Sequence, residues 1–359
     1  LQVAAFHWFN RHLKGSEPII DQAAVPLLKP EDLKVFDKLP ADQIVTKIQE
    51  SFVQLASPPA PPAKFNDWPP QRDQWKKELK EMVFHGWPAE PGPLNVQSVV
   101  SATRGGLQFD AYEFTSQPNV RLRFYTLSRA GLAKPATIEL RVHDDRQWSD
   151  LLAALAAGFS KELSDEFLPA ANEAAFQSLR KSVSGDAVLV FIAPRGVGRT
   201  QWNLNVKAQT QQRRRFVLIG QTLEGMQVFD VRRAIQSLDQ ISRLKNPTLV
   251  VSGTRQSGLI GLFAAIFEPR AASIELVQPP TTFRDGPFLL NIDRVLSVPE
   301  AVAIAAENCP VRFAGVNQAD WSYPRAVART LHLTSDRLTF AGAEGAGPDE
   351  RGERAPPRQ

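Results

Sequence analysis

The sequence is short of the residues that build disulfides and metal sites. It contains a single cysteine, Cys309, so no internal disulfide can form, and its five histidines are scattered singly along 359 residues. No group of His, Cys, Asp and Glu shows the spacing of metal ligands, and no glycine-rich phosphate-binding motif is complete. The sequence therefore predicts neither a metal ion nor a cofactor.

The sequence also lacks long apolar runs and a strong charge of one sign. No apolar run approaches the ~20 residues that a membrane-spanning helix needs. The formal net charge of +4 is small for this length, and no basic stripe with interleaved aromatic residues is present. We therefore expect neither a membrane span nor nucleic-acid binding. The hydrophobic fraction of 43% is ordinary for a globular protein of one large or two medium domains.

The sequence does contain a strand–turn–helix pattern at residues 247–267, PTLVVSGTRQSGLIGLFAAIF. Residues 248–251 are a short β-rich apolar run, which predicts a buried strand. Residues 259–267 are an unbroken apolar run rich in Ala and Leu, which predicts a buried helix. Small and polar residues at 252–258 join the two. The pattern thus predicts a tight turn between a buried strand and a buried helix.

This pattern resembles the nucleophile elbow of α/β-hydrolases, in which G-x-S-x-G exposes a serine at the turn. Gly253 occupies the first glycine position, Ser257 occupies the second, and Gly258 follows it. Arg255 stands at the position of the nucleophile, and a protonated guanidinium cannot attack a carbonyl. Ser257 is out of register to replace it, because the residue two positions before it is Arg255, whereas the tight turn needs a small residue there.

A hydrolase triad also needs an acid and a histidine after the nucleophile. The resemblance places the acid at Asp320, beyond a strand expected at 311–316, although Asp320 can equally cap the helix expected at 322–331. The histidine should follow the last strand, expected at 338–340, but no histidine occurs there, and His332 precedes that strand. Two of the three triad positions therefore fail. An altered site made of Ser257, Asp320 and His332 is the enzymatic alternative.

Three further segments resemble parts of the same fold family. Residues 218–238, LIGQTLEGMQVFDVRRAIQSL, are similar to the helix that precedes the nucleophile strand in acetylxylan-esterase-like hydrolases. Residues 192–198, IAPRGVG, resemble the R-G-x-G turn of prolyl-oligopeptidase-like hydrolases, and we interpret them as structural. His143 ends a strand where hydrolases have an H-G pair that supplies an oxyanion donor, but Asp144 replaces the glycine. We expect His143 to be part of the hydrogen-bonded structure.

The apolar periodicity predicts an α/β domain over residues 94–342. Its first three strands form an antiparallel meander with turns at Gly105-Gly106 and Pro118-Asn119, and strands then alternate with helices, which predicts a doubly wound, mostly parallel sheet. The expected strands are 96–103, 107–114, 120–127, 137–142, 187–192, 248–251, 272–276, 311–316 and 338–340. The expected helices are 148–159, 172–181, 216–242, 256–267 and 322–331. Residues 343–359 are rich in Gly, Pro, Ala and charge, and we expect a disordered tail.

Residues 1–93 precede this domain. An apolar helical face ends at Gly15, and WFNRHLKG at 8–15 resembles the last helix of α/β-hydrolase domains. Residues 1–15 are therefore expected to be the terminal helix of an upstream hydrolase domain, with an independent helix as the alternative. Residues 16–93 are expected to be a helical, Pro-rich connecting region, with helices at 33–39, 41–55 and 69–85 and extended chain at 57–63. Its Trp-bearing helices could form a recognition groove, but packing onto the next domain is the simpler interpretation.

Together these patterns resemble the C-terminal part of a tandem, multidomain carboxylic ester hydrolase similar to acetylxylan esterases, in which this copy is non-catalytic. The resemblance implies Ser-His-Asp ester chemistry in the upstream domain, a secreted or periplasmic location, and two partners: that upstream domain and acetylated polysaccharide. Two alternatives stay open. One is an active serine esterase that acts on acetylated carbohydrate through a displaced Ser257 site, and the other is a carbohydrate-binding module, suggested by seven tryptophans.

Overall fold

The computed structural model describes residues 2–20, 28–52, 59–183, 185–202 and 205–341. It divides the chain into two compact units, Leu1–Gln54 and Leu55–Gln359, which we describe separately. The disordered tail expected at 343–359 lies outside the described residues.

The first unit contains one α-helix, α1 (Gln2–Phe9). The helix continues as a π-turn over Asn10–Lys14 and ends at Gly15, whose φ of 63° is left-handed. No described side chain of this unit is buried, and the face of the helix expected to be apolar is open: Phe6 is 42% exposed and Phe9 is 51% exposed. The described part of this unit therefore has no hydrophobic core of its own.

The prediction of helices at 33–39 and 41–55 is wrong. The described residues there form only 3-10 turns, at Pro30–Leu33 and Ile48–Ser51, and residues 53–55 lie outside the described part of the chain. A short amphipathic helix gains most of its stability from packing of its apolar face. Within this unit Phe52 is 70% exposed, so the apolar spacing has no surface on which to act.

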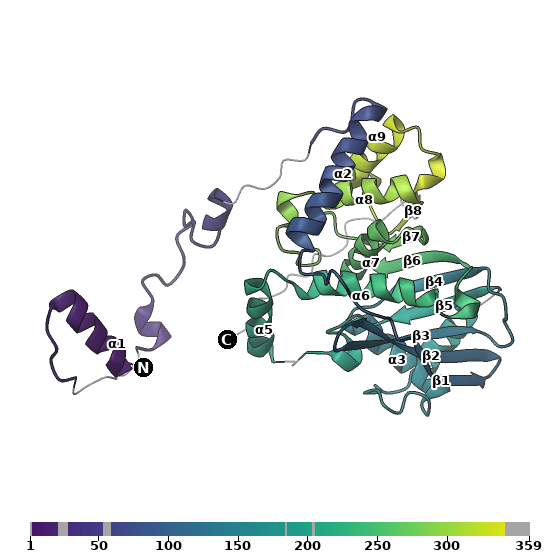
Figure 1. The fold of residues 1–359 in the computed structure, drawn as a ribbon, viewed down its shortest axis with the longest axis horizontal. Helices are drawn as coiled ribbons and strands as arrows, with labels where there is room; N and C mark the ends of the chain where they lie inside the picture. Colours follow the sequence, from purple (N-terminus) through teal and green to yellow (C-terminus); the bar gives the residue numbers. More distant parts are fainter. Residues whose placement is uncertain (1, 21–27, 53–58, 184, 203–204, 342–359) are drawn as a thin grey trace. The chain divides into compact units, whose positions relative to one another are not determined.

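The second unit is built on a nine-stranded sheet with the order β1-β2-β3-β5-β4-β6-β7-β8-β9 (Figure 1). The strands β1 to β3 pair antiparallel, and β3 is antiparallel to β5, whereas the strands from β5 to β9 in that order are parallel. The expected mostly parallel sheet with an antiparallel N-terminal meander is confirmed. The strands are β1 (Gln97–Arg104), β2 (Leu107–Gln117), β3 (Val120–Arg129), β4 (Thr137–Val142), β5 (Ala187–Ile192), β6 (Thr248–Thr254), β7 (Ala271–Val277), β8 (Val311–Ala314) and β9 (Leu338–Ala341).

Strand β6 lies within the parallel part of the sheet, between β4 and β7. Its Leu249 and Val251 side chains are 1% and 0% exposed, which confirms the expected buried central strand. The helix α7 (Gln256–Phe267) follows β6 directly, and all of its residues from Ser257 to Ile266 are buried. A strand and a helix that are both fixed in the core hold the turn between them rigidly.

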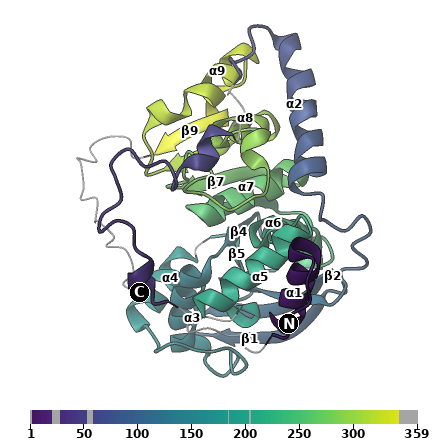
Figure 2. The ribbon, with the colours of Figure 1, turned by 90° about the vertical axis from the view of Figure 1, so that its left-hand side faces the viewer.

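Helices cover both faces of the sheet (Figure 2). Alternate residues of β5 belong to two separate apolar clusters: Leu189 and Phe191 pack with α3, and Val188 and Val190 pack with α6, α7 and α8. This alternation is the period of two that a sheet covered on both faces requires. The helices are α2 (Trp68–Glu78), α3 (Asp145–Phe159), α4 (Glu173–Ser182), α5 (Val206–Leu218), α6 (Leu223–Leu238), α8 (Val298–Asn308) and α9 (Ser322–Thr330).

Two helix expectations need correction. The single helix expected at 216–242 is two helices, α5 and α6, separated at Gly220, whose φ of 72° is left-handed. The left-handed backbone favours glycine there, and a Cβ on Gly220 would lie 2.1 Å from Nε2 of His85, so the His85 ring would have to move. Helix α8 was not expected at all, although Ser297 and Glu300 form a capping box at its start that the sequence displays.

Helix α2 supports the packing interpretation of the Trp-bearing segment. Its Trp68 and Trp75 are 0% and 3% exposed and belong to the main apolar cluster of the second unit. The indole Nε1 of Trp68 donates a hydrogen bond to Glu307 over 2.8 Å. The helix expected at 69–85 is therefore confirmed as α2 with a π-turn at Leu79–Val83, and it is part of the core rather than a recognition groove.

Candidate functional site

Three cavities lie along the edge of the sheet where the parallel strands end, which is where open α/β sheets bind ligands. The Arg255 cavity has a volume of about 420 Å³ and is lined by residues that follow β6, β7 and β8, among them Arg255, Gln278, Asp285, Asn317, Asp320 and Trp321. The His143 cavity, of about 170 Å³, contains His143, Glu224 and Ser257. The Arg123 cavity, of about 250 Å³, contains Arg121, Arg123, Arg199, Glu113 and Glu166.

Arg255 is at the sharp turn between β6 and α7. Its φ of 53° and ψ of −124° lie in a backbone region that residues other than glycine rarely adopt. The turn is held from outside, because the backbone N–H of Arg255 donates to the carbonyl of Val277 on the neighbouring strand over 2.8 Å. The position of Arg255 is therefore set by the backbone of the sheet rather than by contacts of its own side chain.

Two glycines allow this turn. A Cβ on Gly253 would lie 2.7 Å from the Cα of Gly258, and a Cβ on Gly258 would lie 2.8 Å from the carbonyl oxygen of Gly253. Neither neighbour can move aside, because both are backbone atoms. The close approach of strand and helix therefore requires glycine at both positions.

The next two strand ends turn in the same left-handed sense. Gln278, after β7, has a φ of 47°, and Gly315, after β8, has a φ of 67°. The backbone N–H of Gln278 donates to the carbonyl of Ala314 over 2.8 Å, and a Cβ on Gly315 would lie 2.9 Å from Cγ of Gln278. Three successive strand ends thus curl around the Arg255 cavity, and Gly315 makes room for the Gln278 side chain.

The side chain of Arg255 is exposed and forms no hydrogen bond, ion pair or cation–π contact with any residue in the described part of the chain. Two carboxylates, those of Asp285 and Asp320, line the same cavity. The carboxylate of Asp285 accepts a hydrogen bond from the Thr282 hydroxyl over 3.2 Å. The cavity also includes Trp321, which is 0% exposed and whose Nε1 has no partner among the described residues.

The structure places the other three triad candidates apart. Ser257 is 4% exposed and lines the His143 cavity, where its Oγ lies 2.8 Å from the carbonyl of Thr254 and 3.1 Å from Oε1 of Gln147. Asp320 lines the Arg255 cavity. His332 is exposed at the end of α9, with a left-handed φ of 53°, and lines none of the three cavities. None of these three cavities, as the described residues line them, brings Ser257, Asp320 and His332 together.

His143 is a partly buried base whose pKa is lowered. Burial is the largest cause that lowers its pKa, to about 4, and its Nδ1 has no partner among the described residues. Asp144 begins α3, where its carboxylate accepts the backbone N–H of Gln147 over 2.8 Å. The residue that replaces the glycine of the hydrolase motif thus serves as a helix cap. The backbone N–H of His143 donates to the carbonyl of Ile192 over 3.0 Å, which places the residue in the hydrogen-bonded structure at the strand end.

The two segments with the strongest family resemblance meet in one buried ion pair. Arg195, from the turn IAPRGVG, is 9% exposed, and Asp230, from α6, is 0% exposed. The guanidinium donates to both carboxylate oxygens over 2.6 and 2.8 Å, and the Ser116 hydroxyl donates to the same carboxylate over 2.6 Å. These contacts fasten the turn to α6 and support the structural interpretation of this segment.

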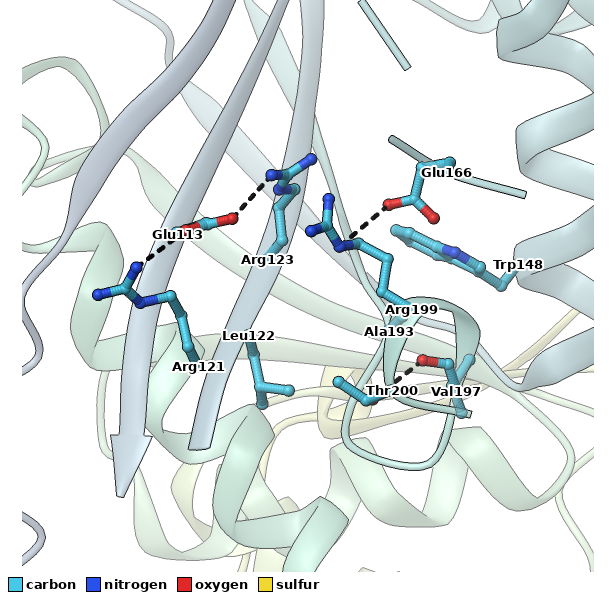
Figure 3. A pocket seen from close by; sticks show the side chains of 10 residues that line it. All are labelled: Glu113, Arg121, Leu122, Arg123, Trp148, Glu166, Ala193, Val197, Arg199 and Thr200. Carbon is cyan, nitrogen blue, oxygen red and sulfur yellow. Dashed lines mark hydrogen bonds and ion pairs between the residues drawn. The ribbon is translucent and has the colours of Figure 1, made fainter. Parts of the chain in front are cut away.

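The Arg123 cavity contains several arginines, all of them paired (Figure 3). Arg123 donates to Glu113 over 2.7 Å and pairs with Asp165 at 3.0 Å, and Arg199 lies 3.9 Å from Glu166. Burial opposes the charge of Arg123, but its bonds to Asp165 and Glu113 raise the pKa of the guanidinium above its ordinary value. This cluster is a balanced network of charges.

Two kinds of feature are absent from the described residues. No group of three or more His, Cys, Asp or Glu side chains there could hold a metal ion. No helix among them is both long and apolar enough to cross a membrane.

Comparison with known proteins gives the fold. No family model matches the sequence, and no curated protein matches it either. The structure is similar to a putative acetyl xylan esterase from Bacteroides fragilis, with a TM-score of 0.59 and 12% identity over 80% of this chain and 77% of that chain. It is also similar to a glucuronoyl esterase from Solibacter usitatus, with a TM-score of 0.55 and 12% identity over 79% of this chain and 87% of that chain. The chain therefore has the α/β-hydrolase fold that these esterases share.

Proposed function

We propose that this chain is a non-catalytic α/β-hydrolase-like domain of a carboxylic ester hydrolase, which keeps the nucleophile elbow and has lost the nucleophile. The observation that carries the proposal is Arg255 at the strained turn between β6 and α7, with Gly253 and Gly258 in backbone contact beside it. A guanidinium has no lone pair available to attack an acyl carbon, whatever its geometry.

The surroundings support the same conclusion. A displaced nucleophile needs a base within hydrogen-bond reach, roughly 2.6–3.2 Å. Within the described residues, the hydroxyl of Ser257 is hydrogen-bonded to the Thr254 backbone and the Gln147 amide. His332 lines neither the Arg255 cavity nor the His143 cavity. Residues 342–359 contain no histidine that could complete a triad after the last strand.

Most of the tryptophans do not support the alternative that this chain is a carbohydrate-binding module. Trp68, Trp75, Trp148 and Trp321 are each at most 3% exposed, so their rings cannot serve as a platform for a sugar. Of the other three, Trp87 stacks on Phe84, Trp202 stacks on Phe216, and Trp8, in the first unit, is 56% exposed. A binding role of the second unit is therefore better supported by the polar side chains of a cavity.

We further propose that the catalytic partner is an upstream hydrolase domain of the same polypeptide, which acts on acetylated polysaccharide. The support comes from the first unit, whose apolar side chains face solvent: Phe6, Phe9 and Leu13 are all more than 40% exposed. Large exposed apolar surfaces mark interaction sites. An open reading frame upstream of Leu1 that encodes G-x-S-x-G and a later histidine supports this arrangement, and a stop codon there overturns it.

The direct test of the non-catalytic role is turnover of an acetyl ester, such as p-nitrophenyl acetate or acetylated xylan, by the purified chain. The proposal expects the same low rate from the chain and from its Ser257→Ala variant. Robust turnover that this substitution abolishes would establish Ser257 as a displaced nucleophile and overturn the proposal.

A further inference from the structure

We propose that the Arg255 cavity binds a small sugar acid, meaning one carboxylate that carries neighbouring hydroxyl groups, and that Arg255 binds the carboxylate. The inference rests on the proposed function, because a cavity with an arginine in the nucleophile position can retain a ligand without cleaving it. Its basis is the cavity itself and the side chains that line it.

The guanidinium of Arg255 is available to a ligand. The guanidinium of Arg255 has no partner among the described residues, although Asp285 and Asp320 line the same cavity. Arginine presents a rigid planar fork of donors that matches a carboxylate in a bidentate arrangement. The other cavities along this edge offer nothing equivalent: Arg123 is paired with Glu113, and Arg213 in the His143 cavity is paired with Glu224 at 3.2 Å.

The position of this cation in the cavity is fixed by the backbone. The backbone of Arg255 is fixed by its hydrogen bond to Val277 and by the close contact of Gly253 with Gly258. A fixed backbone reduces the conformational entropy that ligand binding must remove. The cavity volume of about 420 Å³ lies within the roughly 300–1,000 Å³ of small-molecule sites.

The charged side chains of the cavity favour a ligand with a single negative charge. The cavity has one cation, Arg255, and two carboxylates, Asp285 and Asp320. A ligand with two or more negative charges, such as a phosphate ester, would be repelled by both carboxylates. A ligand with one carboxylate can pair with Arg255, and its uncharged remainder can lie toward the acidic side of the cavity.

The polar side chains of the cavity favour hydroxyl groups on the uncharged part of the ligand. Gln278 presents an amide that both donates and accepts hydrogen bonds, Asn317 keeps its amide N–H groups as donors while its Oδ1 accepts the backbone N–H of Ala319 over 3.1 Å, and Asp285 and Asp320 accept hydrogen bonds. A set of mixed donors and acceptors fits hydroxyl groups, because each hydroxyl also donates and accepts. A sugar acid supplies both the single carboxylate and the hydroxyls.

The experiment is a calorimetric or NMR titration of the full chain with D-galacturonate, its neutral counterpart D-galactose, and acetate. We expect D-galacturonate to bind about tenfold more tightly than either, since a charge-assisted bidentate bond and a set of hydroxyl bonds are each needed. In Arg255→Gln the preference for D-galacturonate over D-galactose is lost. In Arg199→Gln, the matched control at the Arg123 cavity, it persists.

A second variant keeps the test independent of folding. Asp320→Asn removes one of the two negative charges and should tighten D-galacturonate binding about two- to threefold, a gain that misfolding cannot produce. Equal binding of acid and neutral sugar overturns the proposal, and so does a preference that survives Arg255→Gln. Because D-galacturonate has no ester, these outcomes are independent of the turnover assay, which alone decides the proposed function.

Discussion

The Arg123 cavity and the Arg255 cavity contain the same kinds of charged side chain but use arginine in opposite ways. In the first, Arg123 is 9% exposed in its side chain and bonded to Glu113 and Asp165. In the second, Arg255 is exposed and has no partner in the described part of the chain, although Asp285 and Asp320 line the cavity with it. Residue composition alone therefore does not distinguish an arginine that stabilises the fold from one that is available to a ligand.

The difference comes from the backbone that carries each arginine. Arg123 stands on β3 directly opposite Glu113 on β2, so the register of the sheet brings the two charges together. Arg255 stands at a left-handed turn just beyond Thr254, the last residue of β6 that is paired with β7. Regular structure pairs charges across a ladder, whereas a turn at the end of a strand can leave a charge without a partner.

The largest expected effect comes from breaking the paired arginine. Arg123→Met leaves the half-buried Glu113 without its principal partner and should lower the free energy of unfolding by about 3–4 kcal/mol, as for other broken buried pairs. The matched Arg255→Met removes no contact and should change it by less than about 0.5 kcal/mol. Urea denaturation of both variants checks this, and equal losses would remove the distinction between the two cavities.

The pH dependence of stability sharpens the comparison at the His143 cavity, where the pKa of the partly buried His143 is lowered. The pKa of His143 in the folded chain, about 4, lies below its ordinary value of 6.5. The unfolded chain therefore binds the extra proton first, so stability is full above pH 6.5 and falls as the pH drops towards 4, by at most about 3 kcal/mol. His143→Gln should remove that part of the slope in denaturation curves measured between pH 7 and pH 4. An unchanged slope would show that His143 is not buried as a neutral group.

A smaller effect, of opposite sign, is expected at Arg255 itself. A residue with a Cβ is strained at a φ of 53° and a ψ of −124°, whereas glycine is not. This strain lowers the stability of the folded chain. Arg255→Gly should therefore raise the free energy of unfolding by about 1 kcal/mol, after the greater entropy of glycine in the unfolded chain is allowed for. Thermal melting compares it with Arg199→Gly, where no such gain is expected. A loss at Arg255 would mean that its side chain stabilises the turn.

Much of the fold could be predicted because its elements are local. Strands β4 and β5 and helix α7 were predicted to the residue, since β5 and α7 are mostly apolar runs and β4 alternates apolar with polar residues. The break at Gly220 was overlooked although it too is local, because a left-handed glycine ends one helix and Thr222 caps the start of the next. Helix α8 was overlooked although its capping box was visible in the sequence.

The candidate site was only half predictable for the same reason. Arg255 and its two glycines form one continuous motif, so the sequence displays them together. Gln278 and Gly315 belong to the same cavity only because the parallel register of β6, β7 and β8 aligns their ends. The pairing of Arg123 with Asp165 likewise joins a strand to a distant loop and has no local signal.

The measurement that tests the central claim most directly is covalent labelling of the purified chain with a fluorophosphonate, followed by mass spectrometry. An activated serine attacks the phosphorus through its Oγ, fluoride leaves, and a stable adduct remains on that residue. With Arg255 in the nucleophile position and Ser257 hydrogen-bonded beside it, no adduct is expected on the native chain. A stoichiometric adduct on Ser257, absent after heat denaturation, would contradict the account and show that this α/β-hydrolase fold retains a working nucleophile.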